Sequence, residues 1–153
     1  MPPDIFRDMH PLPQSERDRF DAMVEDAIAS LPDEIRTLLE EVPVVVEDMP
    51  TRELCESLIR EWGADADPEE TPERLMQELC GLHDATPFTE ETVEAPTRGT
   101  GHIMLFRVGI LNEAGGWSAG EDAVYEEIGV TLLHEIGHQF GLDEDDLDRL
   151  GYA

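Results

Sequence analysis

The sequence contains no lysine, so its basic side chains are all arginine, and they are few. The 153 residues carry 10 basic and 37 acidic side chains, which gives a formal net charge of -27 at pH 7. Nucleic acids and anionic membranes are bound through clustered basic side chains. The composition therefore predicts neither nucleic acid nor a membrane as a partner. If the chain acts on a peptide or protein substrate, its charge favours a basic one.

Cysteine and long apolar runs are also scarce. Cys55 and Cys80 are the only cysteines, too few and too far apart for a disulfide framework or a zinc knuckle, so we expect both to be core thiols. The longest apolar run, Val42–Val46, is too short to span a membrane. Residues 1–10 contain acidic side chains and no apolar run, which predicts neither a signal peptide nor an anchor and favours a cytoplasmic location.

The length suits one domain over residues 1–153, with a proline-rich, extended lead over residues 1–14. Apolar residues at helical spacing and short valine- or isoleucine-rich runs indicate where helices and strands lie. The predicted helices are residues 15–31, a shorter helix after Pro32, one from Thr51 to Gly63, a short one after Pro72, a long one from Ser118 to Gly141 and a last one within residues 145–152. The predicted strands are residues 42–46 and 102–107.

Some segments are less defined by their pattern. Residues 80–83 fit a strand or the end of a helix, and the sequence does not decide between them. Ile110 and Leu111 predict only a short apolar turn. Residues 87–100 are rich in Thr, Glu, Pro and Gly and predict an irregular segment, either a plain surface loop, which we favour, or a flap over a site. Ser118 and Glu121 predict a capping box at the start of the long helix.

The most informative stretch lies near the C-terminus, where His134, Glu135 and His138 form an H-E-x-x-H motif. Four residues of α-helix advance about 400°, so the two histidines project from the same face and both imidazoles can reach one metal ion. Glu135 projects about 100° away. Its carboxylate is then beside the metal, where it can take a proton from a water molecule that the metal activates.

The residues after His138 indicate how the site is completed. Gly141 stands where a helix commonly ends in a left-handed conformation, which turns the chain back toward the metal. Glu144 lies six residues beyond His138, at a position from which it can supply a third ligand. Two histidines and one carboxylate leave a coordination position of zinc open for water.

Two histidines on a buried helix can instead be ordinary hydrogen-bonded core residues. The preceding run of Val124, Ile128, Leu132 and Leu133 does give the same helix an apolar face that can be buried. The added glycine and acidic residue at the right spacing make coincidence a poor explanation. We therefore predict a Zn²⁺ site.

Four blocks of the sequence resemble a small bacterial family of minimal zincin-like metallopeptidases. The blocks are SLPDEIRTLLEEVPVVVEDMPT, CGLHDATPFTE, HIMLFRVGILN and TLLHEIGHQFGLDEDDLDRLG, and they cover most of residues 30–151. The family pattern H-E-x-x-H-x-x-G-x-x-D maps onto His134, Glu135, His138, Gly141 and position 144. The resemblance implies an α+β fold, in which a small mixed sheet of about four strands packs against the motif helix.

Two positions depart from the family pattern. Glu144 replaces the final aspartate, and its extra methylene changes the reach of the carboxylate by about 1.5 Å. Neighbouring Asp143 or Asp145 is therefore an alternative third ligand. His83 stands where the family commonly has tyrosine, and the sequence assigns it no role.

Motif and resemblance together predict a zinc metallopeptidase that hydrolyses peptide bonds, with Zn²⁺ held by His134, His138 and Glu144. Glu135 is the predicted general base. The alternative is a zinc-binding interaction module without peptidase activity, which the short chain favours. Glu135 argues against that alternative because zinc ligation alone does not need it.

Two further expectations concern the substrate. Tyr125, Tyr152 and His102 are candidates, by residue type only, for stabilising the oxyanion. An extended substrate is expected to pair with the strand at Ile103–Phe106 if that strand lies at the edge of the sheet.

Overall fold

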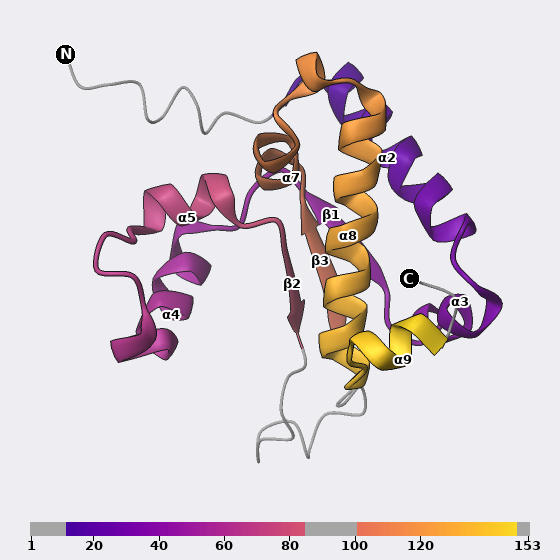
Figure 1. Cartoon of the computed structure of the whole chain (residues 1–153). Coiled ribbons are helices and arrows are strands. Elements are labelled where there is room, and N and C mark those ends of the chain that lie inside the picture. Colours follow the sequence, from indigo (N-terminus) through magenta and orange to yellow (C-terminus); the bar gives the residue numbers. More distant parts are fainter. Residues whose placement is uncertain (1–11, 85–100, 150–153) are drawn as a thin grey trace.

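Helices surround a small mixed sheet in this α+β structure (Figure 1). The computed structural model describes residues 12–84 and 101–149, apart from the side chains of Asp84, Glu144, Leu147 and Asp148. The elements are α2 (Gln14–Ala29), α3 (Asp33–Leu39), β1 (Val44–Glu47), α4 (Arg52–Trp62), η1 (Gly63–Asp65), α5 (Pro72–Glu78), β2 (Gly81–Asp84), β3 (His102–Phe106), α7 (Arg107–Ala114), η2 (Trp117–Ala119), α8 (Glu121–Phe140) and α9 (Glu144–Arg149).

The sheet has the strand order β1-β3-β2. β1 runs parallel to β3, with Val44 opposite Ile103, and β2 runs antiparallel to β3, with Gly81 opposite Leu105. The described residues thus form three strands, not the four that the resemblance implied. Of residues 80–83, which the sequence left undecided between a strand and a helix end, residues 81–83 lie in the strand β2.

Substrate pairing along residues 103–106 depended on an edge position of this strand, and that condition is not met, because β3 pairs on both sides. Ile103, Leu105 and Phe106 are completely buried, as suits a central strand. The apolar content that made this strand easy to predict is therefore a sign of its central position. Within residues 12–84 and 101–149, β1 and β2 each pair with β3 alone.

The long helix α8 packs against β2 and β3 on one side and α2 on the other (Figure 1). Its buried row consists of Val124, Ile128, Leu132 and Ile136, all completely inaccessible to solvent. These residues join the main core, whose other buried members are Phe20, Val24, Ala27, Leu31, Ile35, Val42, Ile103, Leu105, Ile110 and Leu111. None of the helices in the described ranges is long and apolar enough to cross a membrane.

Two predictions for the residues that precede α8 are wrong. Residues around Ile110 form the helix α7, not a turn, and five consecutive residues from Arg107 to Leu111 are buried in it. A helix buried on all sides shows no apolar periodicity, so the sequence pattern hides it. Ser118 does not cap α8, because it lies in η2 and α8 begins at Glu121 after Gly120. The carboxylate of Glu121 instead accepts a hydrogen bond from Nε of Arg19 on α2.

Helices α4 and α5 lie beside β2 (Figure 1). Their side chains form a smaller apolar cluster, called the α4–α5 cluster below. Thr51 and Thr71 cap these helices, their hydroxyl oxygens accepting hydrogen bonds from the backbone N–H groups of Leu54 and Arg74. The buried residues of the cluster are Cys55, Leu58 and Leu75, and Leu82 of β2 packs against them. β2 is thereby held between this cluster and α8.

Buried Arg107 ties α2 to the end of the sheet. Its Nε and Nη2 atoms each donate to Asp21 at 2.9 Å, and Nη1 donates to Asp48 at 2.8 Å. Burial alone would lower the pKa of Arg107, but the bonds to both carboxylates outweigh it and raise the pKa. The guanidinium therefore stays charged and its charge is neutralised inside the fold.

Gly109 marks the closest approach between α7 and the end of α5. A Cβ added there would lie 2.1 Å from the carbonyl oxygen of Leu79, a backbone atom that cannot move aside. We expect Gly109→Ala to lower the free energy of unfolding by about 1–3 kcal/mol, as overpacking does. Urea denaturation followed by circular dichroism measures the change.

The matched control is Gly129→Ala in α8, where an added Cβ has no atom within 4 Å. That substitution should raise the free energy of unfolding by about 0.5–1 kcal/mol, because alanine restricts the unfolded chain and favours helix. Equal effects of the two substitutions would contradict the packing of α7 against α5.

Candidate metal site

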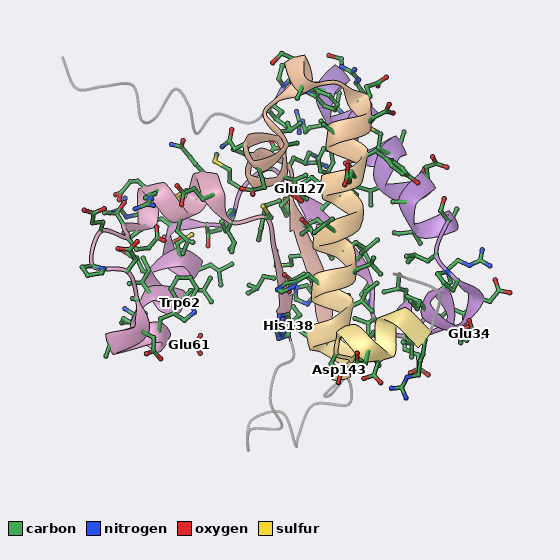
Figure 2. The ribbon with its side chains drawn as sticks, in the orientation of Figure 1. Glu34, Glu61, Trp62, Glu127, His138 and Asp143 are labelled. Carbon is green, nitrogen blue, oxygen red and sulfur yellow. The ribbon has the colours of Figure 1, made fainter. Side chains whose placement is uncertain are left out.

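The C-terminal half of α8 brings the two predicted metal ligands together. The Nε2 atoms of His134 and His138 lie 2.9 Å apart, and their rings meet edge to face at 76° with centroids separated by 4.4 Å. Both side chains are exposed. Figure 2 shows His138 at the lower end of α8, next to β2. The pair is thus open to solvent and to a substrate.

The donor set fits two ligands of a zinc ion. Zinc binds imidazole nitrogen at about 2.0–2.1 Å, so two tetrahedral ligands lie about 3.3 Å apart. Nitrogens already 2.9 Å apart need only small ring rotations to share one ion. Either one imidazole donates a hydrogen bond to the other, or both lone pairs face a common cation.

Glu135 occupies the opposite environment, because only 7% of the residue is exposed. Its Oε1 atom lies 3.1 Å from Nδ1 of His83, a residue of β2. Burying a carboxylate is costly unless it is paired or hydrogen-bonded. His83 provides such a partner, and it comes from the strand that the sequence could not assign.

The alternation of β2 explains how His83 reaches the site. Successive side chains of a strand point to opposite faces, so Gly81 and His83 share the face toward α8, while Leu82 packs against the α4–α5 cluster. A Cβ on Gly81 would lie 2.8 Å from Cγ2 of Thr131 and 3.0 Å from Cγ of Glu135. The absent side chain therefore lets β2 lie close to α8.

The end of α8 follows the prediction. Gly141 adopts the left-handed conformation with φ 68° and ψ 30°, and the N–H of Leu142 donates to the carbonyl of Gly137 at 2.8 Å. Beyond it, Asp143 and Asp146 accept hydrogen bonds from each other's backbone N–H groups.

These two bonds resemble a capping box at the start of α9. One of them engages Oδ1 of Asp143 and leaves its second carboxylate oxygen for a metal, so Asp143 stays an alternative third ligand. Asp145 is exposed. The side chain of Glu144, the predicted third ligand, lies outside the described part of the structure, and Glu144 itself is the first residue of α9.

The described side chains include no cluster of three or more His, Cys, Asp or Glu residues arranged to hold a metal ion. The two cysteine thiols add no ligand to the two histidines. Burial raises the pKa of Cys55 and of Cys80 to about 11, and nearby carboxylates add to the effect. Both are therefore neutral thiols at pH 7 in the metal-free protein. Cys55 is buried as predicted, and Cys80 is half-buried.

The other predicted residues do not join the site or cannot be placed. Tyr125 lies nine residues before His134 on α8, about 13 Å along the axis, and its hydroxyl is 3.3 Å from that of Ser30 on α2's C-terminal cap. Tyr125, a candidate by residue type only, therefore lies away from the two histidines. His102 begins β3. Tyr152, residues 87–100 and most of the lead over residues 1–14 lie outside the described residues.

His83 is the residue that sequence reasoning missed. Its ring stacks on His138 with centroids 5.0 Å apart and planes inclined by 5°, in addition to its contact with Glu135. The only signal in the sequence is the Gly-Leu-His alternation of residues 81–83. That signal is readable only once the segment is known to be a strand.

A helix with two histidines one turn apart, packed on a small mixed sheet, is the architecture expected of a zincin. The sequence model of the zincin-like metallopeptidase family matches residues 39–152, which include every element from β1 to α9. The chain belongs to this family. A comparison with curated proteins finds no match.

The close contact of Gly81 with α8 gives a test of the site's packing. Gly81→Ala should lower the free energy of unfolding by about 1–3 kcal/mol, because the new methyl group meets Thr131 and Glu135. Thr131→Ser removes the nearer methyl group and keeps the hydroxyl. In the double variant the two effects should offset each other in part, and a double-mutant cycle by urea denaturation measures this coupling. Strictly additive effects would contradict the contact.

Proposed function

We propose that the protein is a zinc-dependent peptidase, with His134 and His138 holding the metal and Glu135 acting as the general base. The observation that carries the proposal is the arrangement on α8: two exposed imidazoles whose Nε2 atoms converge to 2.9 Å, beside a buried glutamate. A carboxylate at position 144 is the proposed third ligand. Bound zinc supplies Lewis-acid activation of water and of the scissile carbonyl.

The residues of the chain then account for the proton transfers. Glu135 removes a proton from the attacking water molecule as the water oxygen bonds to the carbonyl carbon of the substrate. The same carboxyl group passes this proton to the amide nitrogen, and the C–N bond breaks to release an amine and a carboxylic acid. The burial of Glu135 strengthens its electrostatic interaction with the reacting groups, because little water screens it.

The proposed position of the substrate moves from β3 to β2. Among the described strands, β2 pairs with β3 on one side only, and it carries His83 next to His138. An extended peptide that adds a strand to the unpaired edge of β2 would satisfy backbone hydrogen-bonding groups on both chains. This arrangement brings a peptide bond close to the two histidines.

Glu135 can be tested separately from the metal ligands. Glu135→Gln keeps the size of the side chain but cannot accept a proton in the same way, so we expect kcat on a mixed peptide library to fall about 10²–10⁴-fold with unchanged zinc content. Glu126→Gln, the same change at an exposed position of α8, is the matched control. His138→Ala should lose zinc itself, which atomic absorption measures.

Stoichiometric zinc without Glu135-dependent cleavage would reject the peptidase and favour the interaction module. Absence of zinc from the wild-type protein in a zinc-supplemented preparation would reject both.

The charge of -27 leads to the proposal that basic peptides are preferred. Of two peptides that differ only in Arg or Glu residues flanking the cleaved bond, the basic one should have a kcat/KM at least about tenfold higher at low salt. Raising the ionic strength from about 0.01 M to 0.15 M shortens the screening length from about 30 Å to 8 Å and should reduce this advantage. Equal kcat/KM values at low salt would contradict electrostatic selection.

A further inference from the structure

The contact between His83 and Glu135 joins the two elements that form the site. Oε1 of Glu135 lies 3.1 Å from Nδ1 of His83, and 9% of the glutamate side chain is exposed, against 31% for the histidine. An ionised carboxylate can only accept hydrogen bonds. We assign the hydrogen of this contact to Nδ1 of His83, because a carboxylate acceptor favours that tautomer.

Two contacts fix the orientation of the His83 ring. Nδ1 is bonded to Glu135, and the ring face stacks on His138 with planes 5° apart. The close approach of β2 to α8 at Gly81 sets the distance between the two backbones. Rigid elements on both sides thus hold the imidazole in one place relative to the carboxylate.

The same geometry argues against His83 as a metal ligand. The lone pair of an imidazole nitrogen lies in the plane of its ring. Two rings 5° from parallel and 5.0 Å apart direct their lone pairs in separate planes that do not meet near the site. His134 and His138, inclined by 76°, do converge. The contact of His83 that bears on the chemistry is therefore its hydrogen bond with Glu135.

We propose that His83 is a positioning residue for Glu135, an inference that rests on the proposed peptidase function. The Nδ1–H group holds Oε1 and leaves the second carboxylate oxygen to take the proton from water. It also partly compensates the buried negative charge without occupying the metal. A misplacement of about 1 Å can cost 10²-fold in rate, so a glutamate held by rigid neighbours is a better base than a freely rotating one.

The contact itself is testable in the metal-free protein by ¹⁵N–¹H correlation spectroscopy of the histidine rings, with His83→Asn assigning the signal. The wild-type spectrum should show His83 protonated at Nδ1. Glu135→Ala should reduce that protonation, because the acceptor that selects this tautomer is gone. Leu82→Ala, which alters the packing of the same strand on its other face, should leave the signal unchanged. A wild-type His83 protonated only at Nε2 would overturn the proposal.

Two variants of equal shape separate the hydrogen bond from the packing. His83→Asn places an amide N–H near the position of Nδ1, and His83→Leu has the same shape without a donor; both lose the ring stack. We expect kcat to fall about 10²-fold in His83→Leu and to recover to within about tenfold of wild type in His83→Asn. KM and zinc content should stay unchanged in both. In a Glu135→Gln background, His83→Leu should cause no further loss.

Equal losses in the Asn and Leu variants, or loss of zinc from His83→Leu, would overturn the positioning role. If wild type cleaves no peptide, the proposed function fails and the catalytic role of His83 fails with it. The ring spectra still decide separately whether His83 holds Glu135.

Discussion

The position of α8 on the sheet is the constraint on which the site depends. Four side chains at intervals of four residues, Val124 to Ile136, are completely buried between the sheet and α2. Each contributes about 1.5–3 kcal/mol relative to exposure, so the rotation of the helix about its axis is strongly determined. Because the helix cannot rotate, His134 and His138 must face outward and Glu135 must face β2. The chemistry of the motif follows from the burial of its helix.

A second constraint comes from two glycines, where the lack of a side chain allows neighbouring elements to pack closely. Gly109 admits the backbone of Leu79 at the end of α5, and Gly81 admits Thr131 and Glu135 of α8. Together they bring β2 close to α8, while Leu82 and the α4–α5 cluster hold the strand from its other face. His83 reaches Glu135 only because of this close packing. The proposed metal-binding face and the proposed base thus come from one helix, and the side chain that contacts this base comes from a strand more than fifty residues earlier.

Residues with local signals were predictable, and residues that depend on tertiary packing were not. The caps Thr51 and Thr71, the left-handed end at Gly141 and the pairing of the two histidines follow from rules that act within one turn of helix. Helix α7 escaped prediction because burial on all sides removes the periodicity that reveals a helix. Strand β2 has only four residues, too few to show a periodicity of its own. The sequence also left open whether β3 lies at the edge of the sheet, since it shows that a strand is apolar but not how many neighbouring strands it has.

The two buried residues of charged type in the described part of the chain, Arg107 and Glu135, differ in how completely other side chains bond them. Arg107 is bound by two carboxylates through three nitrogen–oxygen contacts. These contacts neutralise its positive charge and give it a structural role. Glu135, the only carboxylate in the buried class within the described residues, is bonded by His83 through one oxygen, and its second oxygen remains available. In a chain with 37 acidic residues, negative charge alone distinguishes no site. Glu135 differs from the other carboxylates because it is buried beside two exposed imidazoles. It also has a single hydrogen-bond partner, whereas the charge of Arg107 is fully neutralised.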